Sequence, residues 1–177
     1  SMEYDLMTLG NHDFDHGAEV AIRNAELADF PVLCTNFLTD DGEIPEPIQP
    51  WIFMDIGGIE TAFIGVNTSD TYGLVDPELL SGYQIVSELP AVENALAEVD
   101  SEGAELVVLV SHLGHPPQSE DYTSRVFEAW AEGEDYTKEF AYNSAELTCI
   151  VPGIDLIVSG HTHVALKEPW VNPLTHT

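Results

Sequence analysis

Histidine, asparagine and aspartate gather at three places in this chain, and each place directly follows an apolar run that is typical of a buried strand. The three clusters are Gly10-Asn11-His12-Asp13 with Asp15, Ser111-His112, and Gly160-His161-Thr162-His163. Because loops at the carboxyl ends of strands build ligand sites in α/β proteins, we expect these side chains to meet at one edge of a sheet. Imidazole nitrogens and an amide oxygen are ligands for divalent transition metals. The spacing therefore predicts a metal centre.

His161 and His163 lie two positions apart on a predicted loop, so they need not share a face. They can address two ions held roughly 3.5–4 Å apart, as in two-metal hydrolases. Imidazole favours zinc, manganese, iron, cobalt or nickel over calcium. Taken alone, a Gly-His-Thr-His run is as consistent with polar loop residues, and His16, His115 and His176 are interpreted in that way. Because similar clusters with Asn11-His12 and with His112 follow two other predicted strands, we interpret His161 and His163 as metal ligands.

The elements that must position these clusters alternate between strand and helix. Apolar or alternating runs predict strands over 3–9, 32–35, 105–110 and 154–158, and a hairpin from 51–56 and 59–66 around Gly57-Gly58. Helices are predicted over 17–29, from Ser87 to Gly103, around 126–131 and over 144–151, with loops over 40–47 and 67–83. This alternation around a central hairpin favours a mixed, layered α/β fold.

The chain is strongly acidic, with 32 Asp and Glu residues against 4 Lys and Arg residues and a formal charge of −28. The carboxylates are spread along the whole chain, which favours a salt-adapted surface over an acidic tail. In concentrated salt the Debye length falls to about 3 Å and screens the repulsion. We therefore predict a high-salt environment, either the cytoplasm of a salt-accumulating cell or the cell surface or medium, and the N-terminus does not decide between them.

The same charge bears on partners. Nothing here could neutralise a run of phosphates, so polymeric nucleic acid is disfavoured, and anionic membranes are disfavoured for the same reason. No apolar run is long enough for a transmembrane helix. Cys34 and Cys149 lie far apart in apolar stretches, which predicts two buried thiols, with a disulfide as the alternative.

The motif order LGNHDFDHG, SHLGH and PGIDLIVSGHTH resembles the 5'-nucleotidase branch of the calcineurin-like metallophosphoesterases. This resemblance implies an α/β/β/α sandwich of two mixed sheets flanked by helices. It also implies one divalent ion bound by Asn11, His112 and His161, and a second ion bound by His163. His12 takes the place of the catalytic histidine, and Asp15 orients it. Asp13 is interpreted as a residue that holds the metal ligands in position without binding an ion itself.

Compared with the family pattern, the upstream Asp-x-His and Gly-Asp segments and the C-terminal substrate domain have no counterpart here. We therefore expect residues 1–177 to be part of a single catalytic domain, incomplete at both ends, that alone binds one ion or none and lacks full activity. The predicted function is divalent-metal-dependent hydrolysis of nucleotides or related small phosphate esters, as in 5'-nucleotidases or cyclic phosphodiesterases.

The alternative to an enzyme is a non-catalytic acidic metal-binding remnant or fragment that assembles with another chain. Missing strands would leave a sheet edge exposed, and such edges invite pairing. A homodimer would then cover that edge.

Overall fold

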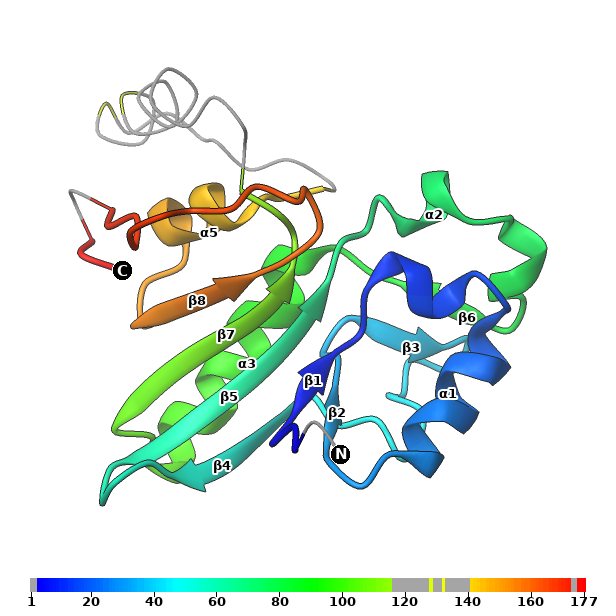
Figure 1. The fold of residues 1–177 in the computed structure, drawn as a ribbon, viewed down its shortest axis with the longest axis horizontal. Coiled ribbons are helices and arrows are strands. Elements are labelled where there is room, and N and C mark those ends of the chain that lie inside the picture. The colour runs from blue at the N-terminus through cyan, green and yellow to red at the C-terminus, as the bar shows by residue number, and fades with distance from the viewer. Residues whose placement is uncertain (1–2, 116–127, 129–131, 133–140, 173–174) are drawn as a thin grey trace.

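Four strands form the largest sheet of the computed structural model, which describes residues 3–115, 128, 132, 141–172 and 175–177 (Figure 1). Their order across the sheet is β4 (Trp51–Asp55), β5 (Glu60–Asn67), β7 (Leu106–His112) and β8 (Leu156–Ser159). The hairpin pair β4 and β5 is antiparallel, whereas β5, β7 and β8 are parallel. The sheet is therefore mixed, as predicted.

The three parallel strands end at the same edge of this sheet. Val66 on β5 pairs with Ser111 on β7, which in turn pairs with Ser159 on β8, and Asn67 pairs with His112. Because the strands stop within a residue of this row, the segments that follow them all begin at one edge. Two of the three histidine clusters follow β7 and β8 and are brought together by this register.

A small parallel sheet of β1 (Met7–Thr8) and β2 (Val32–Leu33) packs on one face of the large sheet. The backbone N–H of Thr35, just after β2, donates to the carbonyl of Gly65 on β5 at 2.7 Å. A Cβ atom on Gly65 would lie 2.3 Å from the Cβ atom of Leu33, so only glycine allows this approach. The small sheet delivers Gly10 and the first cluster to the same edge.

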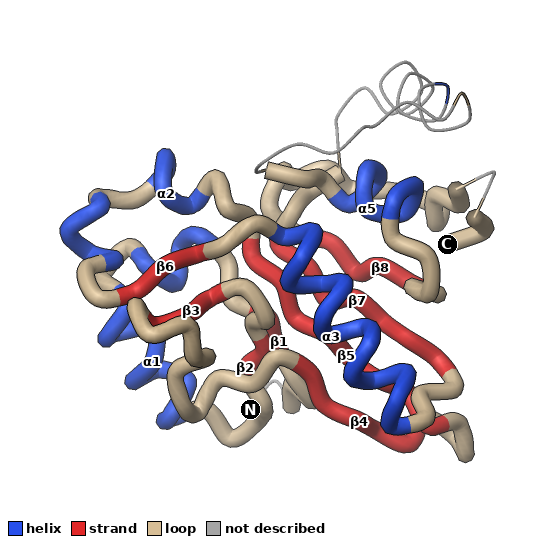
Figure 2. Tube along the Cα trace, turned by 180° about the vertical axis from the view of Figure 1, so that it is seen from behind, coloured by secondary structure: helices blue, strands red, loops and turns tan. Residues whose placement is uncertain are grey.

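Helix α3 (Glu88–Glu102) covers the opposite face of the large sheet (Figure 2). Its Val92, Ala95 and Val99 are buried in one core with Ile64 and Leu109 of the sheet. On the far side of the small sheet, α1 (Ala18–Leu27) contributes to a second core, whose members include Ala21, Ile22, Leu9 and Val32. The layers run helix, sheet, sheet, helix, which confirms the predicted fold class.

Several short elements complete the fold. They are η1 (Asn11–Phe14), α2 (Thr71–Leu74), η2 (Pro77–Leu80), α5 (Ser144–Ile150) and an antiparallel pair of β3 (Phe37–Thr39) and β6 (Tyr83–Ile85). The fully buried side chain of Asn36 joins this pair to β5. Its amide donates to the carbonyls of Asn67 at 2.8 Å and Val86 at 3.0 Å, and its carbonyl accepts from the Asn67 N–H at 2.9 Å.

Most predicted elements are present at nearly the expected positions, including both long helices, the hairpin and the two strands that carry histidines. The strand predicted over 3–9 shortens to Met7–Thr8, and the 67–83 segment, read as a loop, contains α2, η2 and the start of β6. The strand β3 was not predicted. The helix predicted around 126–131 lies almost entirely outside the described residues.

Cys34 and Cys149 are buried free thiols, as predicted. Among the residues that the structure describes, no helix combines the length and apolar character needed to cross a bilayer.

Candidate active site

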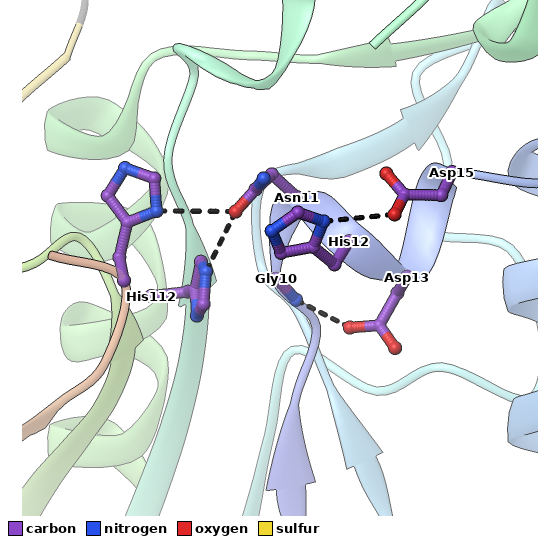
Figure 3. Close-up of polar contacts among 7 residues, drawn as sticks. Gly10, Asn11, His12, Asp13, Asp15 and His112 are labelled. Atoms are coloured by element: carbon purple, nitrogen blue, oxygen red, sulfur yellow. Dashed lines mark hydrogen bonds and ion pairs between the residues drawn. The ribbon is translucent and has the colours of Figure 1, made fainter. Parts of the chain in front are cut away.

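The first cluster is shaped by the 3₁₀ turn η1, which begins directly after Gly10. The carboxylate of Asp13 accepts the Gly10 N–H at 2.7 Å, and the Asp13 N–H donates back to the Gly10 carbonyl at 3.1 Å. Burial raises the pKa of Asp13, and the Gly10 N–H opposes that shift. This reciprocal pair closes the turn that carries Asn11 and His12 (Figure 3).

Asn11 is the point at which the three clusters meet. Its buried side-chain oxygen lies 2.9 Å from Nε2 of His112 and 3.2 Å from Nδ1 of His161. The two imidazole rings are themselves neighbours, with centroids 4.9 Å apart. The structure thus brings together the three residues predicted to bind one ion, although His112 and His161 follow Asn11 by 101 and 150 positions in the chain. Figure 3 shows the contact between Asn11 and His112.

The distances from the Asn11 oxygen to the two histidine nitrogens are compatible with a shared metal ion. Bonds of about 2.0–2.2 Å place neighbouring ligand atoms of one tetrahedral or octahedral ion about 3.0–3.4 Å apart. The separations of 2.9 and 3.2 Å are close to that range. Across the described part of the chain, no group of three or more His, Cys, Asp or Glu side chains is placed to hold a metal. The set at Asn11 differs in that its third donor is an amide oxygen.

Both histidines of this set are held in the form that binds metals. Burial, with smaller contributions from the nearby His161, His12 and His163, lowers the pKa of His112 from 6.5 to about 4. Burial also lowers the pKa of His161, against the opposing charge of Asp70. Neutral imidazole is the metal-binding form, so the site needs no proton release from these rings at neutral pH.

His12 and Asp15 form a second, more open arrangement next to Asn11. Nδ1 of His12 lies 2.9 Å from a carboxylate oxygen of Asp15 (Figure 3), and the two side chains are 76% and 48% exposed. Their exposure puts the imidazole where a ligand arriving from solvent can contact it. The carboxylate fixes the orientation of the ring and the proton on Nδ1.

His163 lies at the edge of the Asn11 cluster, near enough for its charge to act on His112 and His161. It is exposed, and it lines a cavity together with His161. Both histidines adopt positive φ angles, 94° for His161 and 55° for His163, which non-glycine residues rarely do. Of the predicted ligands, the structure therefore gathers Asn11, His112 and His161 and leaves His163 at the rim.

Thr162, which the sequence did not single out, holds the loop between these histidines. Its hydroxyl donates to the His115 carbonyl at 2.8 Å and accepts the His115 N–H at 3.1 Å. A Cβ atom on Gly114 would lie 2.3 Å from the Thr162 methyl group. The loops after β7 and β8 are therefore fastened together, which explains how the unusual backbone of His161 and His163 is maintained.

Asp70 is the other residue that sequence reasoning missed. It follows the end of β5 by three positions, and its charge acts on His161. The rule that located the other clusters, polar residues after a buried strand, applies equally to Asp70. The long strand β5 was predicted, but the residues after it were read as a surface loop.

Most of the chain is similar in sequence to known proteins. A model of the calcineurin-like phosphoesterase family matches residues 2–165. A 5'-nucleotidase of Vibrio cholerae is 34% identical over 113 residues, which is 63% of this chain and 20% of that protein. The trifunctional nucleotide phosphoesterase protein YfkN of Bacillus subtilis is 25% identical over 170 residues, which is 92% of this chain and 10% of that protein. The chain thus spans a fifth or less of the length of these relatives.

Solved structures share the fold. The crystal structure of the calcineurin-like phosphoesterase YfkN from Bacillus subtilis superposes with a TM-score of 0.71 at 23% identity, covering 94% of this chain and 47% of that one. The 5'-nucleotidase precursor from Thermus thermophilus superposes with a TM-score of 0.60 at 22% identity, covering 97% of this chain and 29% of that one.

Proposed function

The chain belongs to the calcineurin-like phosphoesterase family, and from that premise we propose that it hydrolyses phosphate esters of nucleotides or related small molecules with the help of divalent metal ions. One observation carries the proposal: the oxygen of Asn11 lies within 3.2 Å of nitrogen atoms of both His112 and His161, with the His12–Asp15 pair beside them. The related proteins are named as nucleotidases and nucleotide phosphoesterases, which does not favour the non-catalytic alternative.

Asn11, His112 and His161 would hold one ion, and His163 would contribute to a second. Manganese, zinc, iron, cobalt and nickel all suit two imidazoles and an amide oxygen. When bound, such ions polarise a phosphoryl oxygen and lower the pKa of a bound water. The rest of the chemistry falls to side chains of this chain.

His12 is the proposed catalytic residue. A protonated His12 donates from Nδ1 to Asp15 and has its Nε2 proton available for a phosphoryl oxygen or the leaving oxygen of the ester. Asp15 keeps the ring in that orientation and stabilises its positive charge. Asp13 contributes indirectly, because its hydrogen bond to Gly10 holds the turn that carries both Asn11 and His12.

The proposed substrate is a small phosphate ester, with nucleotides as the class suggested by the relatives. The homodimer predicted from the sequence stays a prediction, as do the high-salt environment and the identity of the metal. None of these is needed for the proposed role of His12.

The test is release of nitrophenol from p-nitrophenyl phosphate, and of phosphate from AMP, with manganese at multimolar potassium chloride. Because the chain alone is expected to lack full activity, we expect turnover well below the enzyme median of about 10 s⁻¹. A chelator should abolish it, and His12→Ala should lower it by about 100-fold or more.

The matched control is His16→Ala, which removes an exposed histidine that has no assigned role. This variant should retain the unmodified rate. Hydrolysis that survives both the chelator and His12→Ala would contradict the proposed function.

A further inference from the structure

The pairing of β7 with β8 does not by itself place His161 at the Asn11 oxygen. The hydrogen bonds between these strands extend to the Gly160 N–H, which donates to the Ser111 carbonyl at 3.0 Å. His161 follows directly with a φ of 94°, so the backbone leaves the strand conformation at this residue. Contacts beyond the strand pairing must therefore fix the direction in which His161 points.

Thr162 supplies one such contact, between the loop after β8 and the loop after β7. Its hydroxyl donates to the His115 carbonyl at 2.8 Å and accepts the His115 N–H at 3.1 Å. The Thr162 side chain is otherwise exposed, so it adds little to the hydrophobic core. What it adds to the fold is this pair of hydrogen bonds, one residue beyond His161.

Ser144 supplies a second contact, at the start of α5, which lies beside β8 in both overall views (Figures 1 and 2). Its buried hydroxyl oxygen lies 2.7 Å from the hydroxyl oxygen of Ser159 on β8 and 3.2 Å from that of Ser111 on β7. The Ser144 N–H also donates to the carbonyl of Gly114 at 3.0 Å. A single residue of α5 thus joins the ends of both strands and the loop after β7.

These two contacts lie on either side of the predicted ligands along the chain. Ser111 directly precedes His112, and Ser159 precedes His161 by two positions, whereas Thr162 follows His161. The short segment that carries His161 is therefore held at both ends. Between these ends, the His161 ring lies beside the His112 ring, with centroids 4.9 Å apart.

We propose that Thr162 and Ser144 are positioning residues of the metal site, whose hydroxyl groups hold His161 where its Nδ1 lies 3.2 Å from the Asn11 oxygen. Thr162 contributes more, because it acts beyond Ser159, where β8 ends. The use of this position for metal binding rests on the proposed function, whereas the position itself does not. Neither residue needs to touch the ion or the substrate.

The first measurement uses the full chain without metal, in multimolar potassium chloride, and detects the nuclear Overhauser effect between the ring protons of His112 and His161. Thr162→Val removes the hydroxyl and keeps the shape of the side chain, whereas Thr162→Ser keeps the hydroxyl. We expect the effect to be lost in Thr162→Val and weakened in Ser144→Ala. It should be retained in Thr162→Ser.

The matched control is Thr39→Val on β3. It also removes a threonine hydroxyl that accepts a backbone N–H, that of Glu43 at 3.3 Å. This variant should give the same Overhauser effect as the unmodified chain. Circular dichroism of each variant establishes that it is folded.

The second measurement follows cobalt binding by visible absorption. Residues that orient metal ligands typically contribute about 10–100-fold to metal affinity, so the dissociation constant for cobalt should rise about tenfold or more in Thr162→Val. Because Thr162 acts through His161, the same change should have less than about a twofold effect in a chain that already carries His161→Ala. A residue that only stabilises the fold would weaken binding equally in both chains.

An unchanged Overhauser effect in both Thr162→Val and Ser144→Ala would overturn the inference. In a chain that binds cobalt, an effect of Thr162→Val on affinity that is the same with and without His161 would also overturn it. The inference and the proposed function can fail separately. A chain that binds no cobalt but gives the expected Overhauser effects would reject the metal site and leave the positioning of His161 standing.

Discussion

Replacing Gly10 with alanine should damage the metal site without unfolding the chain. The backbone of Gly10 is extended, with φ −123° and ψ 175°, so alanine fits its conformation. An added Cβ atom, however, would lie 2.8 Å from three atoms of the His112 ring. The clash is therefore with a predicted ligand rather than with the backbone.

The size of the effect follows from that distance. To restore ordinary contact at 3.4 Å or more, the ring must retreat by about 0.6 Å, which is 3.4 minus 2.8. This displaces Nε2 from its position 2.9 Å from Asn11. Misplacement of a reacting group by about 1 Å can cost about 100-fold. We expect metal affinity to fall about 10–100-fold, or about 1.4–2.8 kcal/mol.

The assay is calorimetric titration with manganese or zinc, with denaturant unfolding of the metal-free chain alongside. Because alanine restricts the unfolded chain, the free energy of unfolding should change by less than about 1 kcal/mol. Gly73→Ala is the control, since no atom lies within 4 Å of the Cβ atom it would add. Unchanged metal affinity in Gly10→Ala would refute the assignment of His112 as a ligand beside Asn11.

Three further outcomes are expected. Gly65→Ala should destabilise the fold by about 3 kcal/mol, because its Cβ atom would lie 2.3 Å from Leu33; denaturant unfolding that matches the unmodified chain would contradict this close packing. Because the pKa of His112 is lowered from 6.5 to about 4, the unfolded chain takes up this proton first as the pH falls, so the contribution of His112 to stability is full above pH 6.5 and is lost toward pH 4. The shift corresponds to at most about 3.4 kcal/mol, and partial exposure of the ring reduces this to about 1–2 kcal/mol. When denaturant unfolding is measured at pH 6.5 and at pH 4, the His112→Gln variant should lack this loss of stability. Finally, a charge of −28 predicts that the melting temperature, followed by circular dichroism, falls as potassium chloride is diluted from multimolar to about 0.1 M, and a constant melting temperature would argue against salt adaptation.

The long elements of the fold could be predicted because their signals are local. Leu89, Val92, Leu96 and Val99 recur at helical spacing between Ser87 and Gly103, and α3 occupies Glu88–Glu102. Likewise, the continuous apolar run before His112 is a strand buried between two layers. In both cases the apolar residues that form the sequence pattern are the residues that the fold buries.

The pair β3 and β6 could not be predicted in this way. Each strand has three residues, and their pairing joins segments more than forty positions apart, such as Phe37 with Ile85. What holds them is the buried Asn36 side chain, whose partners, Asn67 and Val86, lie on other segments. No local periodicity records such a contact.

The candidate site shows the same division. The residue types and their positions after strands predicted that the three clusters would meet at one edge of the sheet, and the family resemblance implied the set of Asn11, His112 and His161. The strand register brings these three residues together. The role of Thr162 depends on its contact with the loop at Gly114, which only the tertiary structure shows. The exposed position of His163 depends on the path of the same loop.

The central claim, that Asn11, His112 and His161 share a divalent ion, is tested most directly by titrating the metal-free chain with cobalt and following its visible absorption. The account predicts saturable cobalt binding. Loss of a residue that only orients a ligand typically costs about 10–100-fold in metal affinity, and His161→Ala, which removes a ligand itself, should weaken binding by more than that. The His176→Ala chain, which loses an exposed histidine elsewhere, should bind like the unmodified chain. Equal cobalt affinity in His161→Ala and His176→Ala would contradict the claim.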